Sequence, residues 1–274
     1  MTAGTPAANT GAASRAWLGD RAGRAAPPLI ALVVLLLLWE LLGRADALPR
    51  PLSTPSSIAG AFSQHWEHLL RSGWNTLIEA LGGLFIGTTL GLLTAFAAAR
   101  FVVARDILLP LAIGAAAIPL VALAPIFNNW FGITSPLSKM AMSSVLVFFP
   151  IFISATRGLV EVSPGALELM RSYAVSDTEV LRKVRIPNML PFFFTALKVS
   201  TTLAFIGAIV AEYFGGSSDV IGRVVITAMF AGDFGLGWSG ILLGAVAAII
   251  AYLVVAAVER RAIPWYISLR DGEV

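Results

Sequence analysis

Long apolar runs without charge alternate with short polar segments along the chain. Residues 80–99 and 234–258 contain no charged residue, and neither does the longer run at 107–138. A helix needs about 20 predominantly apolar residues to cross the roughly 30 Å hydrocarbon layer of a membrane. The pattern therefore predicts six membrane-spanning helices, at residues 27–43, 76–99, 107–129, 138–157, 190–212 and 236–258.

The apolar runs are continuous and do not alternate with a period of two, which favours helices over a membrane β-barrel. Open strands are excluded because each unpaired backbone group costs several kcal/mol in lipid. Hydrophobic residues make up 57% of the chain and charged residues 13%, against about 45–50% and about 25% in soluble proteins. The sequence thus predicts an all-α membrane protein and excludes a typical soluble enzyme, a disordered chain and a coiled coil.

Basic residues are distributed unevenly between the two sides that the spans define. With the N-terminus inside, the inner segments hold thirteen of the 19 lysines and arginines and the outer segments five, while Lys198 lies within a span. Cytoplasmic segments carry such an excess, so both termini are expected in the cytoplasm. Alternatively, the first apolar segment is a cleaved signal peptide ending near Ala45-Asp46-Ala47, but cleavage would leave five spans and break the charge pattern.

The spans divide the chain into four parts. Residues 1–26 are rich in Ala, Gly, Thr and Ser and are expected to form a disordered cytoplasmic tail. Residues 27–73 hold the first transmembrane helix and an outer loop, residues 74–262 a five-helix core, and residues 263–274 a cytoplasmic C-terminal tail. A short helix is expected at residues 219–230, either lying on the outer surface or dipping into the membrane.

Several kinds of chemistry are excluded or unsupported. The chain has no cysteine, which excludes disulfides, cysteine-ligated zinc and thiol catalysis. Two histidines, His65 and His68, do not specify a metal site. None of the three lysines lies in the Gly-Lys-Ser/Thr sequence of a phosphate-binding P-loop. We therefore predict no catalytic residue, no metal and no cofactor bound by this chain, and the net charge of +3 is too small to indicate nucleic acid.

The longest cytoplasmic loop, at residues 157–188, predicts two short amphipathic helices. Ser163-Pro164 is typical of a helix start. Ser176 with Glu179 three residues later has the arrangement of a capping box, and Pro187 is expected to end the second helix. From periodicity alone the loop is either a knob that docks into a groove of a partner protein or a segment that lies on the membrane surface.

The loop resembles the coupling-loop motif of ABC importer permeases. That motif runs Glu-Ala-Ala, three residues, Gly, nine residues, then Ile-x-Leu-Pro, and the segment from Glu168 to Pro187 has the same spacing. It departs from the motif at Leu169 and Met170, which replace two alanines, and at Ala174, which replaces the glycine. These departures affect the detail of the docking surface.

Other stretches resemble the nitrate, sulfonate and taurine import permeases of this family. They are the run Ala117-Ile-Pro-Leu-Val-Ala-Leu-Ala-Pro-Ile-Phe127 with Trp130-Phe-Gly132, then Phe148-Phe-Pro150, and Ala211-Glu-Tyr-Phe-Gly215. The resemblance covers about residues 74–266. It implies the type I ABC importer permease fold, in which six transmembrane helices carry a cytoplasmic coupling loop, here residues 161–187.

The resemblance also implies partners. Two ATPase subunits, which hold ATP and Mg, would dock on the loop, a solute-binding protein would deliver a small solute from outside, and a second permease copy would complete the path in the bacterial cytoplasmic membrane. The residues assigned to ATPase coupling are Glu168, Leu169, Met170, Arg171, Ala174, Val175, Ser176, Val184, Ile186 and Pro187. The substrate stays open between nitrate, sulfonate, taurine or bicarbonate and a pyrimidine vitamin precursor or riboflavin.

Five residues are candidates for the translocation path or its gate. Pro119 and Pro125 are expected to bend the third span, so that it lines the path with Asn128 near the outer mouth. Lys198 lies within the fifth span. It is expected either to contact the substrate or to have a structural role, in which it pairs with an acid or extends its ammonium group to the inner surface. Glu212 is either a gate residue or part of helix-end packing.

The alternative function is that of a self-sufficient secondary transporter driven by an ion gradient. Such a protein needs paired ionisable groups at mid-depth in the membrane. Glu40, Glu79 and Lys198 come nearest to this, but all lie towards the ends of spans. The permease of an ABC importer is therefore the preferred interpretation.

Overall fold

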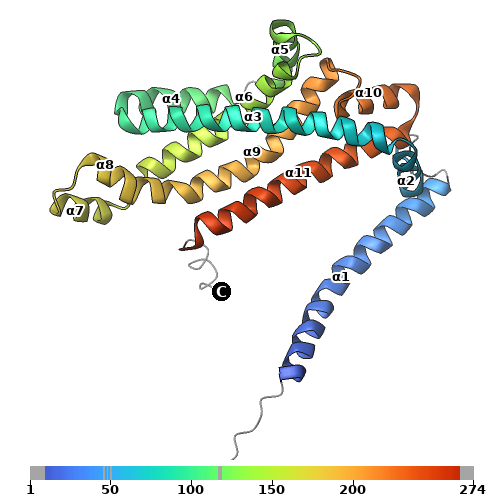
Figure 1. The fold of residues 1–274 in the computed structure, drawn as a ribbon, viewed down its shortest axis with the longest axis horizontal. Helices are drawn as coiled ribbons and strands as arrows, with labels where there is room; N and C mark the ends of the chain where they lie inside the picture. Colours follow the sequence, from blue (N-terminus) through green and yellow to red (C-terminus); the bar gives the residue numbers. More distant parts are fainter. Residues whose placement is uncertain (1–9, 46, 48, 50, 117–118, 266–274) are drawn as a thin grey trace, which may run out of the picture.

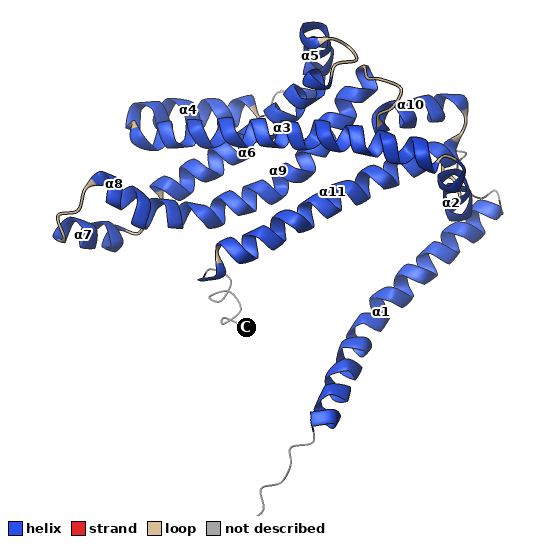
Figure 2. Ribbon diagram, in the orientation of Figure 1, coloured by secondary structure: helices blue, strands red, loops and turns tan. Residues whose placement is uncertain are grey.

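The computed structural model describes residues 10–45, 47, 49, 51–116 and 119–265 (Figure 1). All regular structure in these ranges is helical (Figure 2). The elements are α1 (Thr10–Arg44), α2 (Pro55–Gln64), α3 (Trp66–Arg100), α4 (Val102–Ala115), the 3₁₀ turn η1 (Leu120–Leu123), α5 (Ala124–Phe131), α6 (Pro136–Val160), α7 (Pro164–Ser172), α8 (Asp177–Val180), the π-helical turn η2 (Leu181–Arg185), α9 (Ile186–Phe214), α10 (Ile221–Ala231) and α11 (Phe234–Ala262).

Five of the predicted spans correspond to helices that are long and apolar enough to cross a membrane. They are the apolar part of α1, then α3, α6, the continuous helical stretch from α8 to α9, and α11. The predicted third span, 107–129, is not one helix, because the chain divides there into α4, η1 and α5. Pro119 and Pro125 explain the break, since a proline donates no hydrogen bond and is accommodated at a helix start.

The predicted disordered tail is wrong in part. Helix α1 begins at Thr10, so that residues 10–26 are helical. This segment is rich in alanine, the residue with the highest helix propensity. Residues 1–9 and residues 266–274 of the predicted C-terminal tail lie outside the described residues.

Helices α3, α6 and α9 form the centre of the bundle, where Val147, Ile151 and Phe205 are buried. Glycines along one face of α3 bring its backbone against α6. A Cβ added at Gly87 would lie 2.5 Å from the carbonyl oxygen of Ser144, which no side chain tolerates. Such small residues allow close helix packing in lipid, and here the packing is within one chain.

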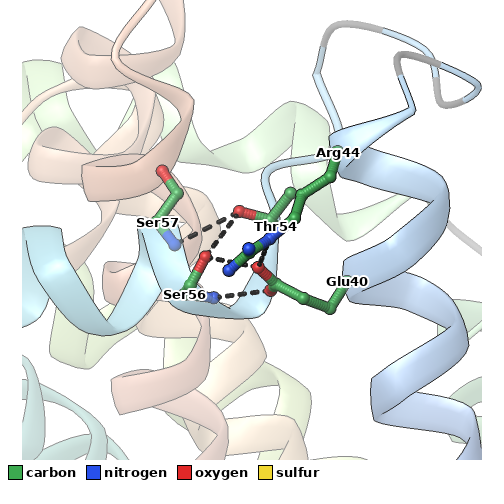
Figure 3. Close-up of polar contacts among 5 residues, drawn as sticks. All are labelled: Glu40, Arg44, Thr54, Ser56 and Ser57. Carbon is green, nitrogen blue, oxygen red and sulfur yellow. Dashed lines mark hydrogen bonds and ion pairs between the residues drawn. The ribbon is translucent and has the colours of Figure 1, made fainter.

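Helix α1 stands apart from the bundle and meets it at one end only (Figure 1). No residue of its apolar stretch Pro27–Arg44 is buried. At the joint, the Glu40 carboxylate accepts hydrogen bonds from the Ser56 N–H at 3.0 Å and the Ser56 hydroxyl at 2.6 Å (Figure 3). Arg44 Nε also donates to Glu40, at 2.7 Å. Because Ser56 lies in the first turn of α2, Glu40 helps to cap that helix.

Candidate functional site

The segment 161–187, which we call the knob, projects from one end of the bundle with α7 and α8 at its tip (Figure 1). The Ser163 side chain caps α7 by accepting from the Ala166 N–H at 3.4 Å. At α8, Ser176 Oγ accepts from the Glu179 N–H at 3.4 Å, and Glu179 Oε2 accepts from the Ser176 N–H at 3.2 Å. Both predicted helix starts are confirmed, including the capping box.

The end predicted for the second knob helix is wrong. Pro187 does not end it but lies in the first turn of α9, and the chain stays helical from Asp177 to Phe214. The π-helical turn η2 ends at Arg185, two residues before this proline. A wider turn accommodates the missing N–H and the bulk of the proline ring. The knob therefore continues directly into a spanning helix.

Two side chains tie the knob end of α9 to the end of α6. Asn188 Nδ2 donates to the carbonyl oxygens of Gly158 at 2.8 Å and Glu161 at 3.1 Å, and Arg185 Nη1 donates to that of Leu159 at 3.1 Å. These carbonyls belong to the last turn of α6 and its C-cap, where a helix has no partners of its own. A displacement of the knob is therefore passed to α6 and α9 together.

The ten residues predicted to couple the chain to an ATPase differ in their exposure. Glu168, Leu169, Arg171, Ala174 and Ser176 are exposed at the tip, with Leu169 56% exposed. The remaining five, which are Met170, Val175, Val184, Ile186 and Pro187, are half-buried.

Val184 and Pro187 line an open hollow of about 740 Å³ between the knob, α9 and Trp265. The exposed residues at the tip include an acid, Glu168, a base, Arg171, and an apolar side chain, Leu169. Tyr173, which lies beside them, is 70% exposed. This tip is a compact surface suited to contact with another protein.

Ala174 occupies a special backbone position. It is the residue that replaces the motif glycine, and among the described residues it is the one non-glycine residue with a positive φ, at 50°. A left-handed backbone strains any residue with a Cβ and favours glycine. The turn between α7 and α8 therefore has the conformation that the motif glycine would accommodate without strain.

The far end of the bundle, which carries α2, α5 and α10, holds a buried polar cluster. The Lys139 side chain is completely buried. Its Nζ donates to the carbonyl oxygen of Ile133 at 2.5 Å and to Asn128 Oδ1 at 3.3 Å. Asn128 thus holds the lysine of α6 against α5. Pro119 and Pro125 are exposed, at the starts of η1 and α5.

Glu212 is also completely buried in this cluster. Its Oε2 accepts from the Gly222 N–H at 2.5 Å, and next to it Thr76 Oγ1 accepts from the Ile221 N–H at 2.9 Å. Both donors are in the first turn of α10, whose own N-cap residue, Val220, makes no side-chain hydrogen bond. The N-terminus of α10 is therefore capped by α3 and α9.

Lys198 lies away from this cluster. It is fourteen residues before Glu212 on α9, which is about 21 Å along a helix, and its Nζ pairs with Glu259 Oε2 of α11 at 2.6 Å. Structural pairing, one of the roles expected for this lysine, is thus present. The path candidates do not form one site, because Asn128 and Glu212 belong to the far-end cluster while Lys198 braces α9 against α11.

Sequence reasoning missed two charged members of the far-end cluster. Lys139 is one of the five basic residues of the predicted outer segments, and Glu79 is an acid expected near the end of a span. The structure instead buries Lys139 and places the Glu79 carboxyl next to that of Glu212. The available signal was a charged residue within or beside an apolar run, which is a functional-site indicator in membrane helices.

Comparison with known proteins agrees with this arrangement. Residues 87–264 match the family described as binding-protein-dependent transport system inner membrane component. The chain belongs to this family. It is therefore a permease component of ABC transport, a component that is not itself catalytic.

Relatives with assigned names have the same role. The chain is 32% identical to a probable ABC transporter permease protein of Haemophilus influenzae over 73% of this chain and 82% of that protein. It is 29% identical to a formylaminopyrimidine transport permease protein of Halalkalibacterium halodurans, over 72% and 79%. It is also 29% identical to a taurine transport system permease protein of Escherichia coli, over 73% and 71%. The match of residues 87–264 includes both the knob and most of the far-end cluster.

Proposed function

We propose that this permease imports a small solute across the bacterial cytoplasmic membrane, driven by ABC ATPase subunits that dock on the knob. The observation that carries the proposal is the structure of the knob, which has an exposed tip around Glu168 and Leu169 and is tied through Asn188 and Arg185 to two spans. A force applied at the tip by a partner moves α6 and α9. In this proposal the knob and both termini are cytoplasmic, which the excess of basic residues in these segments supports.

The motor is a separate subunit in this proposal, because the chain has no P-loop. ATP and Mg would be bound by the two ATPase subunits, and ATP-driven approach of these subunits would switch the path between its inward-facing and outward-facing states. A solute-binding protein would deliver the solute at the far end. No contact with nucleic acid is part of the proposal.

A second permease copy would complete the path. The apolar face of α1 supports this, since Leu29, Leu35 and Leu41 are about 60% exposed and do not pack on the bundle of their own chain. Membrane lipid would cover whatever part of α1 the second copy leaves uncovered. A homodimer accounts for a chain whose five long apolar helices are few for an alternating-access pathway.

The substrate is proposed as a class. Relatives are named for transport of taurine, aliphatic sulfonates, nitrate, formylaminopyrimidine and riboflavin. We propose either a nitrate-, sulfonate- or taurine-like anion or a pyrimidine-type vitamin precursor. Uptake assays with each labelled compound decide between the two classes.

Charge reversal at the knob tests the proposed coupling. We expect Glu168→Arg to abolish co-purification of the ATPase or stimulation of its activity in reconstituted membranes, because Glu168 is exposed at the centre of the docking surface. Glu67→Arg is the matched control, since Glu67 is equally an exposed helix acid but lies in α3 at the far end. An intact Glu168→Arg complex with normal stimulated hydrolysis would overturn the docking role.

A further inference from the structure

The buried carboxyl groups of Glu79 and Glu212 form a second feature, distinct from the knob. We propose that these two groups bind one proton between them, and that this proton belongs to the lock that holds α10 against α3 and α9. The proposal rests on the geometry of the far end and does not depend on the role of the knob or on the identity of the solute.

The first observation is a missing hydrogen-bond donor. Glu212 is completely buried and Glu79 is 4% exposed, and their carboxyl groups are close enough to share a hydrogen bond. Within the described residues, Glu79 Oε2 and Glu212 Oε1 receive no hydrogen bond. Two ionised carboxylates are acceptors only and repel each other, whereas a carboxylic acid next to a carboxylate donates an O–H to it. A single proton shared by the two groups supplies the missing donor and removes the repulsion between two carboxylates.

The second observation is the balance of charge. Lys139 is fully buried and lies close enough to both acids to interact with them electrostatically. With both acids ionised, these three side chains carry a net negative charge inside the bundle, and an uncompensated buried charge is strongly destabilising. With one proton bound, the ammonium balances the remaining carboxylate and the cluster is neutral.

In the part of the chain that the structure describes, the elements around the pair supply no other buried cation. On α9, Tyr213 follows Glu212, and α5 contributes the uncharged amide of Asn128. On α10, the charged residue is Arg223, which is half-exposed and packs beside Gly216. On α3, the basic side chains of His68 and Arg71 are directed to Asp219, at 3.9 and 3.5 Å. Within the described residues, Lys139 is therefore the cation that balances the pair.

The third observation connects the pair to α10. Glu212 Oε2 accepts from the Gly222 N–H, so the carboxylate that caps α10 belongs to the group that shares the proton. The backbone at Gly222 comes so close that an added Cβ would lie 2.6 Å from the Cβ of Glu212. Further along, Asn75 Nδ2 donates to the carbonyl oxygen of Asp219 at 2.7 Å. The start of α10 is thus fixed directly on the protonated pair.

Infrared spectroscopy of the intact permease in lipid nanodiscs detects the proton directly. We expect wild type to show the C=O stretching band of a buried protonated carboxylic acid at neutral pH. The variants Glu79→Gln and Glu212→Gln should each lose this band, since a glutamine amide replaces the acid and keeps one donor for the neighbouring carboxylate. Absence of the band in wild type, or its persistence in both variants, would overturn the proposal.

Thermal stability across pH provides the second measurement. Above about pH 4.3, where glutamate ionises in an unfolded chain, the folded wild type binds one more proton than the unfolded chain, so its stability falls as the pH rises. Each single Gln variant should lack this component. The double variant Glu79→Gln/Glu212→Gln leaves Lys139 without a counter-charge, and its Tm should fall by about 5 °C or more below that of the single variants.

These readouts also separate the proton from a metal cation. If a monovalent metal ion filled the gap, the Tm of wild type would rise with Na⁺ or K⁺ concentration and the protonated-acid band would be absent. That result would overturn the proposal. If one Gln variant does not assemble, the other variant and the pH dependence of wild type still decide the question.

Discussion

The knob and the far end both fix the start of a short helix with an acid and a hydroxyl, but they draw these residues from different distances along the chain. In the knob, α8 is capped by Ser176 and Glu179, which are three residues apart and belong to the same segment. At the far end, α10 is capped by Thr76 from α3 and Glu212 from α9, the first of which is 145 residues from its donor. The first cap is local and exposed, and the second is tertiary and buried.

Glu40 represents a case between these two. It caps α2 from α1, sixteen residues away, and Arg44, its basic partner, is 69% exposed in its side chain (Figure 3). Exposed ion pairs contribute little to stability because water solvates the separated charges. Buried ones are costly to break because the remaining charge loses both partner and water. The more deeply an acid is buried, the more the stability of the fold depends on its partners.

The largest effect is expected from removing the buried cation. Lys139→Met leaves the acids of the far end without their counter-charge and should lower the free energy of unfolding by about 3–5 kcal/mol. Lys183→Met is the matched control, because this lysine is 63% exposed and pairs with Glu179 on one helix face. It should cost only about 0.3–0.5 kcal/mol. Thermal unfolding of both variants in detergent measures the difference, and equal shifts would contradict it.

A smaller effect is expected from adding one methyl group at the far end. In Gly222→Ala the new Cβ would lie 2.6 Å from both the Glu212 Cβ and the carbonyl oxygen of Ile209. Overpacking of this kind typically costs about 1–3 kcal/mol. The same change in the knob, Gly165→Ala, meets nothing within 4 Å.

Alanine is favoured over glycine in a helix, so Gly165→Ala should leave the Tm unchanged or raise it slightly. A Gly222→Ala protein as stable as wild type would show that α10 is not held tightly at its first turn.

The same contrast explains what the sequence predicts and what it does not. The caps at Ser163 and Ser176 involve residues within three positions of each other, so they can be predicted from the sequence alone. The spans are readable because lipid imposes a minimum apolar length. The contact between Glu79 and Glu212 is not readable, since it depends on how α3 and α9 pack, and each acid by itself is consistent with a helix end.

Two errors have local causes. The predicted third span failed because an uncharged run satisfies the length rule even where Pro119 and Pro125 interrupt the helix. The end predicted at Pro187 failed because proline is equally compatible with the start of a helix, and the π-helical turn before it lets the helical path continue. In both cases the effect of the proline on the helix depends on the turn beside it.

The smallest effect is expected in the turn between α7 and α8, where the same substitution should have opposite signs at two alanines. Ala174→Gly relieves a left-handed residue with φ 50°. Relief of this strain stabilises the turn by about 1–2 kcal/mol. The greater freedom of glycine in the unfolded chain offsets about 0.4–1 kcal/mol of this gain. The free energy of opening the knob should therefore rise by roughly 0.5 kcal/mol. Ala166→Gly, within the regular helix α7, should lose about 0.5 kcal/mol.

Hydrogen exchange of the amides in residues 164–183 measures both changes locally, because the exchange rate of an amide reports the local opening of its own segment. Protection should increase in Ala174→Gly and decrease in Ala166→Gly. If both variants lose protection, the backbone at Ala174 is not strained. In that case the departure from the motif glycine reflects the proposed docking surface and not the geometry of the turn, since the exposed methyl group of Ala174 would matter through its contact with a partner.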